Sequence, residues 1–382
     1  MMSRAVRLAL LLLLGAVLVR TAWLCDDAYI SFRTVRNFVE GEGLRWNLVE
    51  RVQAYTHPLW LFLLSGAYAL THEIYLTSIA VSLLVSLAAA WLLGFRLAPH
   101  PVAGAFALAL LASSRSFVDY STSGLENPLV HLLLGLLVVV YLERPDKLLA
   151  VAGVAALAAV TRLDTVLLTT PLVAAAWWRV RSLRAAALVA AGYAPLVAWE
   201  LFSIVYYGVP FPNTAYAKIA GLPAGELVSQ GAAYLESCAR FDPVAALALV
   251  AAVLLAFLPR ARRLLPAAAG IVVYLAYLVK IGGDFMAGRF LTAPLVLATA
   301  ILVQLVPRGT FGFIPAALAL LVGLSRGDES TFVSGGDYGT RRPWREYIDQ
   351  AQIADERAIY YKITGVLRNG AAFRTPEHRW FD

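Results

Sequence analysis

The sequence contains few charged residues and almost no cysteine. Charged side chains make up 15% of the 382 residues, hydrophobic ones make up 60%, and the mean hydropathy is +0.70. A single soluble core of this length could not bury so much apolar surface, which excludes an ordinary globular protein. Two cysteines are also too few for a disulfide framework. The composition therefore indicates a polytopic, all-α membrane protein.

Motifs that bind nucleotides or zinc are missing as well. The sequence has no P-loop, no GxGxxG pattern, no zinc-type Cys/His spacing and no convincing internal repeat. The formal net charge of +7 could suggest a nucleic-acid partner. However, Lys and Arg lie in short clusters between apolar runs, which is typical of loops that orient a membrane protein. We therefore expect no nucleotide substrate and no nucleic-acid partner.

Apolar segments recur from the N-terminus to about residue 325. The first, residues 8–24, follows Arg4 and Arg7, and we expect an uncleaved anchor because no small-x-small cleavage site precedes Cys25. The later segments are roughly residues 59–70, 77–95, 101–113, 128–142, 147–161, 165–178, 185–205, 243–258, 264–279, 290–306 and 310–325.

The basic loops decide which of these segments cross the bilayer. If residues 59–70 crossed, the arginine clusters at 179–184 and 260–263 would lie outside, against the positive-inside rule. If that short segment instead lies on the surface, both clusters fall inside, together with Arg96, residues 144–147 and Arg308. We therefore predict about 11 transmembrane helices, an outside C-terminus and a first outer loop at about 25–76. Residues 29–39 and 59–70 are its interfacial helices.

This topology gathers the unusual polar residues on the outer side. They are Asp26 and Asp27, Arg115, Asp119 and Glu126, Arg162 and Asp164, Asn213, Tyr216 and Lys218, and Lys280, Asp284 and Arg289. Ionisable groups at a membrane are costly and often functional, although ordinary interfacial ion pairs are the alternative for any one of them. Carboxylates can accept a hydroxyl proton or hold a metal, whereas Arg and Lys bind phosphate. The mixture fits a substrate that has both hydroxyls and a phosphate.

Histidine and cysteine give weaker signals. His57, beside Pro58 at the start of an interfacial helix, is a candidate for substrate contact, whereas His131 lies within a span and reads as a packed, hydrogen-bonded histidine. Cys25 and Cys238 both fall at outer ends of spans, where a disulfide could form. Two cysteines alone do not decide whether they pair.

Several motifs occur in an order that resembles one family. They are DDAYISFRTVRNFVEGEGLRWNLVERVQAYTHPLW, YSTSGLENPL, TRLD, YYGVPFPNTAYAK, GGDFMAGRF and ADERAIYYKITG. Together they resemble the actinobacterial AftB-like arabinofuranosyltransferases. This resemblance implies a GT-C-type fold and transfer of a sugar, D-arabinofuranose, from a polyprenyl-phosphate donor to a hydroxyl of a cell-envelope glycan or glycoprotein. It also implies an active site facing outward from the cytoplasmic (inner) membrane.

The resemblance also implies residue roles. Asp26 and Asp27 are expected to be catalytic, with either one as the general base, and Lys218 and Arg289 to bind the donor together with Arg162. Substrate contacts are expected from His57, Glu126, Asn213, Tyr216 and Asp284. The sequence requires no cofactor, and paired acids permit a divalent metal without demanding one.

Two parts of the chain are expected to differ in role. Residues 1–325 form the GT-C-type transmembrane catalytic domain, and residues 326–382 form an extracytoplasmic C-terminal segment. That segment resembles the opening of a longer outer domain in relatives, so either this homologue is compact or the C-terminal part is missing. Leu163 also replaces the proline expected after Arg162.

Two other functions fit the same composition. A transporter or flippase of lipid-linked sugars would also need many spans and buried charge, but it usually shows paired half-repeats with broken helices. A non-catalytic scaffold would leave the acidic pair without a task.

Overall fold

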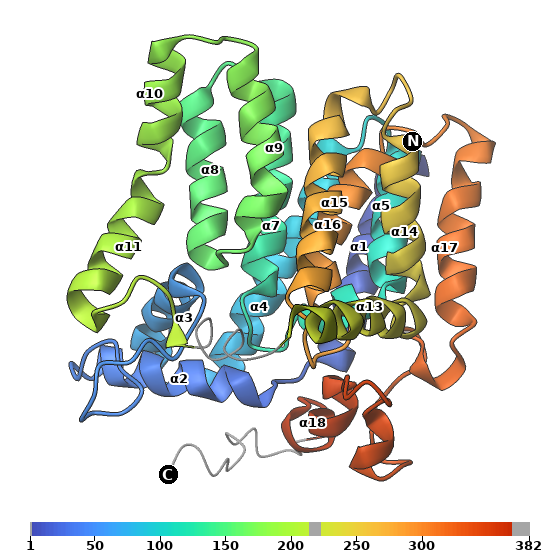
Figure 1. The fold of residues 1–382 in the computed structure, drawn as a ribbon. Helices are drawn as coiled ribbons and strands as arrows, with labels where there is room; N and C mark the ends of the chain where they lie inside the picture. The colour runs from blue at the N-terminus through green and yellow to red at the C-terminus, as the bar shows by residue number, and fades with distance from the viewer. Residues whose placement is uncertain (1, 214–222, 369–382) are drawn as a thin grey trace.

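A computed structural model describes residues 2–213 and 223–368. Helices joined by loops make up this part of the chain, and its β-structure is limited to two isolated bridges, Met286–Ala354 and Ile348–Ala354. The apolar helices run side by side in a bundle, as Figure 1 shows. These features agree with the predicted all-α membrane protein.

The bundle helices follow the apolar segments of the sequence closely. They are α1 (Met2–Thr21), α4 (Ile74–Trp91), α5 (Pro101–Ser113), α7 (Asn127–Glu143), α8 (Leu148–Thr161), α9 (Thr165–Trp178), α10 (Leu183–Gly192), α11 (Ala194–Tyr207), α14 (Pro243–Leu255), α15 (Leu265–Lys280), α16 (Thr292–Leu302) and α17 (Ile314–Leu324). A π-helical turn, Leu92–Leu97, extends α4. The predicted segment 185–205 is bent by 51° between α10 and α11, where Pro195 begins the second helix.

Few of these helices are long enough to cross a membrane alone. Among the described residues, Ile74–Leu97 and Arg262–Lys280 are both long and apolar enough, and the count reaches five if three bent pairs are each one span. A helix of 13 residues such as α5 is only about 20 Å long at ~1.5 Å per residue, shorter than the hydrocarbon core. The count of about eleven therefore stays a prediction.

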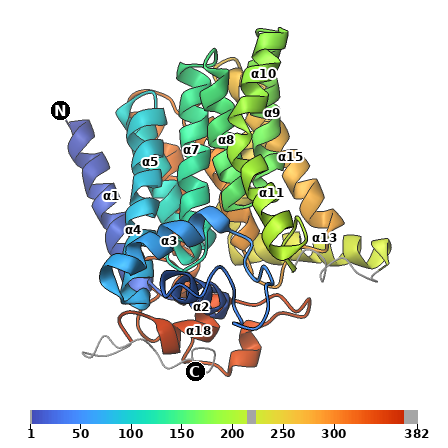
Figure 2. The ribbon, with the colours of Figure 1, turned by 90° about the vertical axis from the view of Figure 1, so that its left-hand side faces the viewer.

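Four helices lie at one end of the bundle, across or beside the ends of the long helices. They are α2 (Asp26–Val39), α3 (Pro58–Thr71), α13 (Ala224–Phe241) and α18 (Glu356–Thr364), at the lower end in Figures 1 and 2. The chain turns by 88° between α1 and α2 and by 112° between α13 and α14. Helices α2 and α3, which pack together, are the two short helices predicted for the first outer loop. The sequence analysis missed α13 and α18.

The C-terminal segment is fastened to the same end of the bundle. Thr364 Oγ1 donates to the carbonyl of Leu24 at 2.6 Å, and the backbone N–H of Leu24 donates back to Thr364 Oγ1 at 3.2 Å. The Tyr361 hydroxyl donates to the carbonyl of Arg20 at 2.6 Å. Helix α18 is thereby held directly beneath the turn from α1 to α2.

Candidate active site

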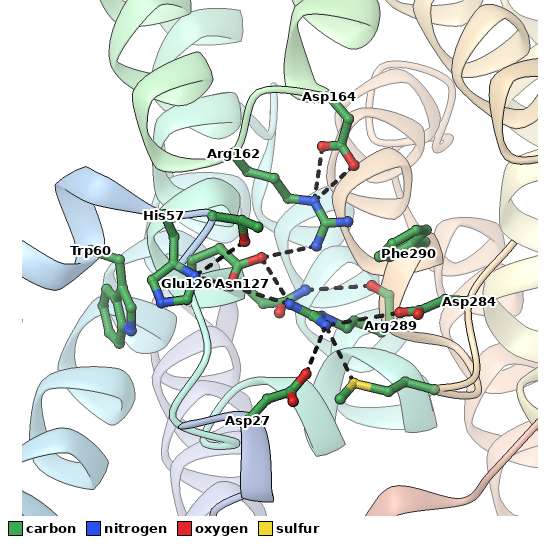
Figure 3. Close-up of polar contacts among 12 residues, drawn as sticks. Asp27, His57, Trp60, Glu126, Asn127, Arg162, Asp164, Asp284, Arg289 and Phe290 are labelled. Atoms are coloured by element: carbon green, nitrogen blue, oxygen red, sulfur yellow. Dashed lines mark hydrogen bonds and ion pairs between the residues drawn. The ribbon is translucent and has the colours of Figure 1, made fainter. Parts of the chain in front are cut away.

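Glu126 lies at the centre of a cluster of charged side chains at this end of the bundle. It precedes α7, and its carboxylate accepts from Arg162 Nη1 at 2.9 Å and from Arg289 Nη2 at 3.2 Å (Figure 3). Arg162 comes from the turn between α8 and α9, and Arg289 opens the short 3-10 helix Arg289–Leu291 before α16. One carboxylate thus holds together the loop before α7, the turn between α8 and α9, and the loop before α16.

The cluster is largely closed to solvent. Glu126 is 0% exposed, and Arg162 and Arg289 are each 9% exposed. Burial alone would raise the pKa of Glu126, but Arg289, His57 and Arg162 lower this pKa to about 2. Glu126 is therefore ionised at neutral pH. Since a buried charge without partners is costly, its first task is to hold the two arginines in place.

His57 extends the cluster towards α2. Its Nδ1 lies 3.3 Å from Glu126 Oε2, and its Nε2 lies 2.8 Å from the Ser31 hydroxyl oxygen. Burial lowers the pKa of His57 to about 4, against the opposing effect of Glu126, so the ring is neutral at neutral pH. An ionised Glu126 only accepts, which assigns the proton to Nδ1 and leaves Nε2 to accept from Ser31. His57 therefore links Glu126 to α2.

Arg162 is held in place by protein groups. Its Nε contacts both carboxylate oxygens of Asp164 at 2.8 and 2.9 Å, and its guanidinium lies 4.1 Å above the ring of Phe290. Together with the bond to Glu126, these contacts fix its plane. The predicted role of Arg162 in donor binding stays a prediction, and its contacts favour an orienting role.

Arg289 faces the acids of the predicted site. Its Nη1 lies 4.0 Å from Asp27 Oδ2 and 3.8 Å from Asp284 Oδ2. The side chain of Asp27 is 38% exposed, whereas that of Asp284 is 0% exposed. The structure therefore brings together Asp27, Glu126, Asp284, Arg289 and His57 as predicted, with Asp27 on the accessible side.

The aspartate pair belongs to α2 itself. The sequence analysis placed Asp26 and Asp27 between the first apolar segment, 8–24, and a helix at 29–39, but α1 ends at Thr21 and both residues form the first turn of α2. Carboxylates are favoured there because the helix dipole is positive at its N-terminus. Asp26 Oδ1 accepts from the Asp27 backbone N–H at 2.8 Å.

Two glycines allow the loops of the site to approach so closely. Gly124 has φ +82°, and a Cβ there would lie 2.6 Å from the Cβ of Ala28 in α2. Gly288 has φ +77°, and a Cβ there would lie 2.3 Å from the Ser116 hydroxyl oxygen. Any other residue would strain the backbone and push Glu126 or Arg289 away from its neighbours.

The remaining predicted residues lie elsewhere or outside the described part. Asn213 is exposed, and its backbone N–H donates to the Gln53 carbonyl at 3.1 Å. Tyr216 and Lys218 lie outside the described residues. Within residues 2–213 and 223–368, no group of three or more His, Cys, Asp or Glu side chains could hold a metal ion, so the structure adds no support for a divalent metal.

The structure answers the open question about the two cysteines and corrects one interpretation. Cys25 and Cys238 are both buried and free, and the Cys238 sulfur accepts from the Gly288 N–H at 3.2 Å. His131 is buried but not hydrogen-bonded: within the described residues neither ring nitrogen has a partner. Its ring stacks on Phe117 instead, with ring centroids 5.0 Å apart.

Sequence reasoning also missed contacts made by the C-terminal segment. Arg357 of α18 lies with its Nε 2.8 Å from Asp119 Oδ1, and the Tyr360 hydroxyl donates to Asp26 Oδ2 at 2.7 Å. Both residues belong to the ADERAIYYKITG motif. This motif was noted in the sequence analysis, but no role was assigned to it, although it could have indicated these contacts.

Comparison with known proteins gives one informative relative. The chain is 30% identical to the terminal beta-(1->2)-arabinofuranosyltransferase of Mycobacterium tuberculosis in an alignment of 407 positions that covers 90% of this chain and 63% of that relative. No family model and no solved structure matches the chain. The similarity supports the assignment of the chain to the AftB-like family that its motifs predicted.

Proposed function

We propose that the chain is a membrane glycosyltransferase that moves D-arabinofuranose from a polyprenyl-phosphate donor to a hydroxyl of a cell-envelope glycan or protein. The reaction takes place on the outer face of the cytoplasmic membrane. One observation carries this proposal: Asp27, Glu126 and Arg289 converge at one end of a bundle whose sequence is 30% identical to an arabinofuranosyltransferase.

The proposed reaction needs one proton acceptor and a cation for the leaving group. The acceptor hydroxyl oxygen attacks the anomeric carbon, the bond from that carbon to the phosphate oxygen breaks, and the hydroxyl proton passes to a carboxylate. Asp27 suits this last role better than Asp26, because its side chain is 38% exposed and lies beside Arg289. Asp26 instead accepts a hydrogen bond from Tyr360.

Arg289 is suited to stabilise the departing polyprenyl phosphate. Its guanidinium is oriented by Glu126 from one side and lies within 4.0 Å of Asp27 and Asp284 on the other. A preoriented cation stabilises developing negative charge without further rearrangement. Lys218 and Arg162 would add positive charge, and the lipid tail would lie against the apolar helices.

Acceptor-dependent bond cleavage tests the proposal. Purified protein in liposomes is mixed with polyprenyl-phosphate arabinofuranose, with and without an arabinan acceptor, and the release of polyprenyl phosphate is measured. Release only with acceptor supports transfer. Movement of the lipid-linked sugar across the bilayer without cleavage would instead support the transporter, the alternative from the sequence.

A further inference from the structure

Helix α18 of the C-terminal segment brings two side chains to the aspartate pair. Tyr360 donates its hydroxyl to Asp26 Oδ2 at 2.7 Å. Glu356 lies four residues earlier, on the same face of the helix. Glu356 is 5% exposed, and within the described residues its buried Oε2 has no hydrogen-bond partner. A carboxyl group thus lies in the protein interior beside other acids.

The start of α18 is also bound to the loop that contains Asp284 and Arg289. The Ala354 N–H donates to the Phe285 carbonyl at 2.6 Å, and the Ala287 N–H donates to the Ala354 carbonyl at 2.9 Å. Since Glu356 follows two residues after Ala354, it lies between α2 on one side and this loop on the other. Both contacts hold it at the site described above.

We propose that Tyr360 and Glu356 are positioning residues of the active site, supplied by the C-terminal segment. Tyr360 fixes Asp26 as a hydrogen-bond acceptor, whereas Asp27, which is partly exposed beside Arg289, is the carboxylate proposed to receive the proton. Glu356 acts in its neutral acid form, so that it adds no further negative charge near Asp26, Asp27 and Asp284. This assignment rests on the proposed function and distinguishes the two aspartates.

The charges around Glu356 account for its neutral form. Burial, then Asp26 and Asp27, then Asp284 and Asp355, raise the pKa of Glu356 to about 8. The neighbouring titratable groups are the thiol of Cys25 and the hydroxyls of Tyr120 and Tyr360, and Arg289 contacts Asp27 and Asp284. Above pH 8 an ionised Glu356 would add a negative charge where a phosphate must bind.

The pH dependence of transfer tests the role of Glu356. We expect kcat/KM for the polyprenyl-phosphate donor to fall above pH 8 in the wild type, by about tenfold at pH 9, because one unit above the pKa about a tenth of the group stays neutral. Glu356→Gln, which mimics the neutral acid, should lose this alkaline decline, so that its kcat/KM at pH 9 stays close to its own value at pH 7. The same decline in both proteins would overturn the role of Glu356.

Tyr360 is tested against a neighbour on the same helix. Tyr360→Phe should lower kcat about tenfold or more with the donor KM little changed, because the hydrogen bond to a charged group is lost. Tyr361→Phe is the matched control, since its hydroxyl donates to the Arg20 carbonyl and not to a carboxylate. Equal effects of the two substitutions on kcat would overturn the role of Tyr360.

A stability measurement, which does not depend on sugar transfer, separates this proposal from the proposed function. Thermal unfolding of the wild type and Glu356→Gln is compared from pH 5 to 9. Because the pKa of Glu356 is raised on folding, wild-type stability falls as the pH rises from about 4.5 to about 8, so the advantage of Glu356→Gln should grow across this range. The wild type could show no sugar transfer while the stability advantage of Glu356→Gln still grows with pH. The proposed function would then be wrong, but the conclusion that Glu356 is neutral would hold. A constant difference would overturn the neutral Glu356.

Discussion

Arg289 and Glu126 are 163 positions apart in the sequence, yet Arg289 Nη2 lies 3.2 Å from Glu126 Oε1. The pair joins the loop before α7 to the loop before α16. Asn127, the first residue of α7, strengthens this junction because its side-chain amide donates to Thr292 Oγ1 at 2.9 Å. A charged contact between two loops therefore fixes the position of Arg289 relative to the start of α7.

Asp27→Asn tests the proposed base. Asparagine keeps the size of the side chain but cannot take up the proton, so turnover should fall about a hundred- to ten-thousandfold, as measured with radiolabelled donor. Asp26→Asn should give a smaller loss. Membrane insertion and melting temperature should stay unchanged in both variants. Full activity in both variants would show that the two aspartates only mark the start of a helix.

Arg289→Lys tests the proposed contact to the donor phosphate. Lysine keeps the charge next to Glu126 but cannot reproduce the planar arrangement of guanidinium hydrogen bonds, so donor kcat/KM should fall tenfold or more, about 1.5–3 kcal/mol. Arg308→Lys, at an exposed arginine beyond the C-terminal end of α16, is the control. Similar small losses in both variants would remove Arg289 from the site.

Glu126→Gln tests the central carboxylate through acid unfolding. The pKa of Glu126 is lowered on folding from 4.5 to about 2, so its ionisation stabilises the fold above pH 4.5, and this contribution is lost as the pH falls towards 2. The full effect is about 3 kcal/mol. Thermal unfolding between pH 6 and 3 should therefore show a steeper decline in the wild type than in Glu126→Gln.

Glu143→Gln is the control for this experiment. Glu143 pairs with Arg96 at the surface, with side chains 39% and 54% exposed, and such pairs contribute about 0–1 kcal/mol. Its acid unfolding should follow that of the wild type. A parallel decline in all three proteins would show that Glu126 does not control acid stability.

Reporter fusions test the membrane orientation. If residues 59–70 do not cross, reporters placed after Arg184 and Arg263 should lie in the cytoplasm, and one placed after Ser330 should lie outside. Ser330 adjoins Thr331, whose carbonyl accepts a hydrogen bond from Arg20 near the end of α1. A reporter after Ser330 therefore reports the side of the membrane on which the aspartates lie. A cytoplasmic signal at Ser330 would reverse the proposed orientation of the site.

The helices could be predicted from sequence because their determinants are local. Apolar runs ended by arginine, proline or glycine give the bounds of α5, α8 and α9 almost to the residue. The sequence also predicted the two short helices α2 and α3. That residues 59–70 do not cross the membrane stays a prediction, which rests on the basic clusters further along the chain.

The internal geometry of the site could not be predicted in the same way. The sequence predicts that Glu126, Arg162 and Arg289 occur in outer loops, but not that the two arginines share one carboxylate. It also gives no sign that α13 turns by 112° into α14 or that Tyr360 donates to Asp26. These features depend on contacts between residues far apart in the chain, which periodicity does not encode.

The bond between Tyr360 and Asp26 has a consequence for biosynthesis. Because the two residues are 334 positions apart, the ribosome releases the aspartates into the membrane long before it makes their partner. A nascent chain that has inserted α1 to α17 still has Asp26 without Tyr360 and Leu24 without Thr364. The order of synthesis therefore means that the contacts of α18 with Asp26 and Leu24 form last, after all the bundle helices have been made.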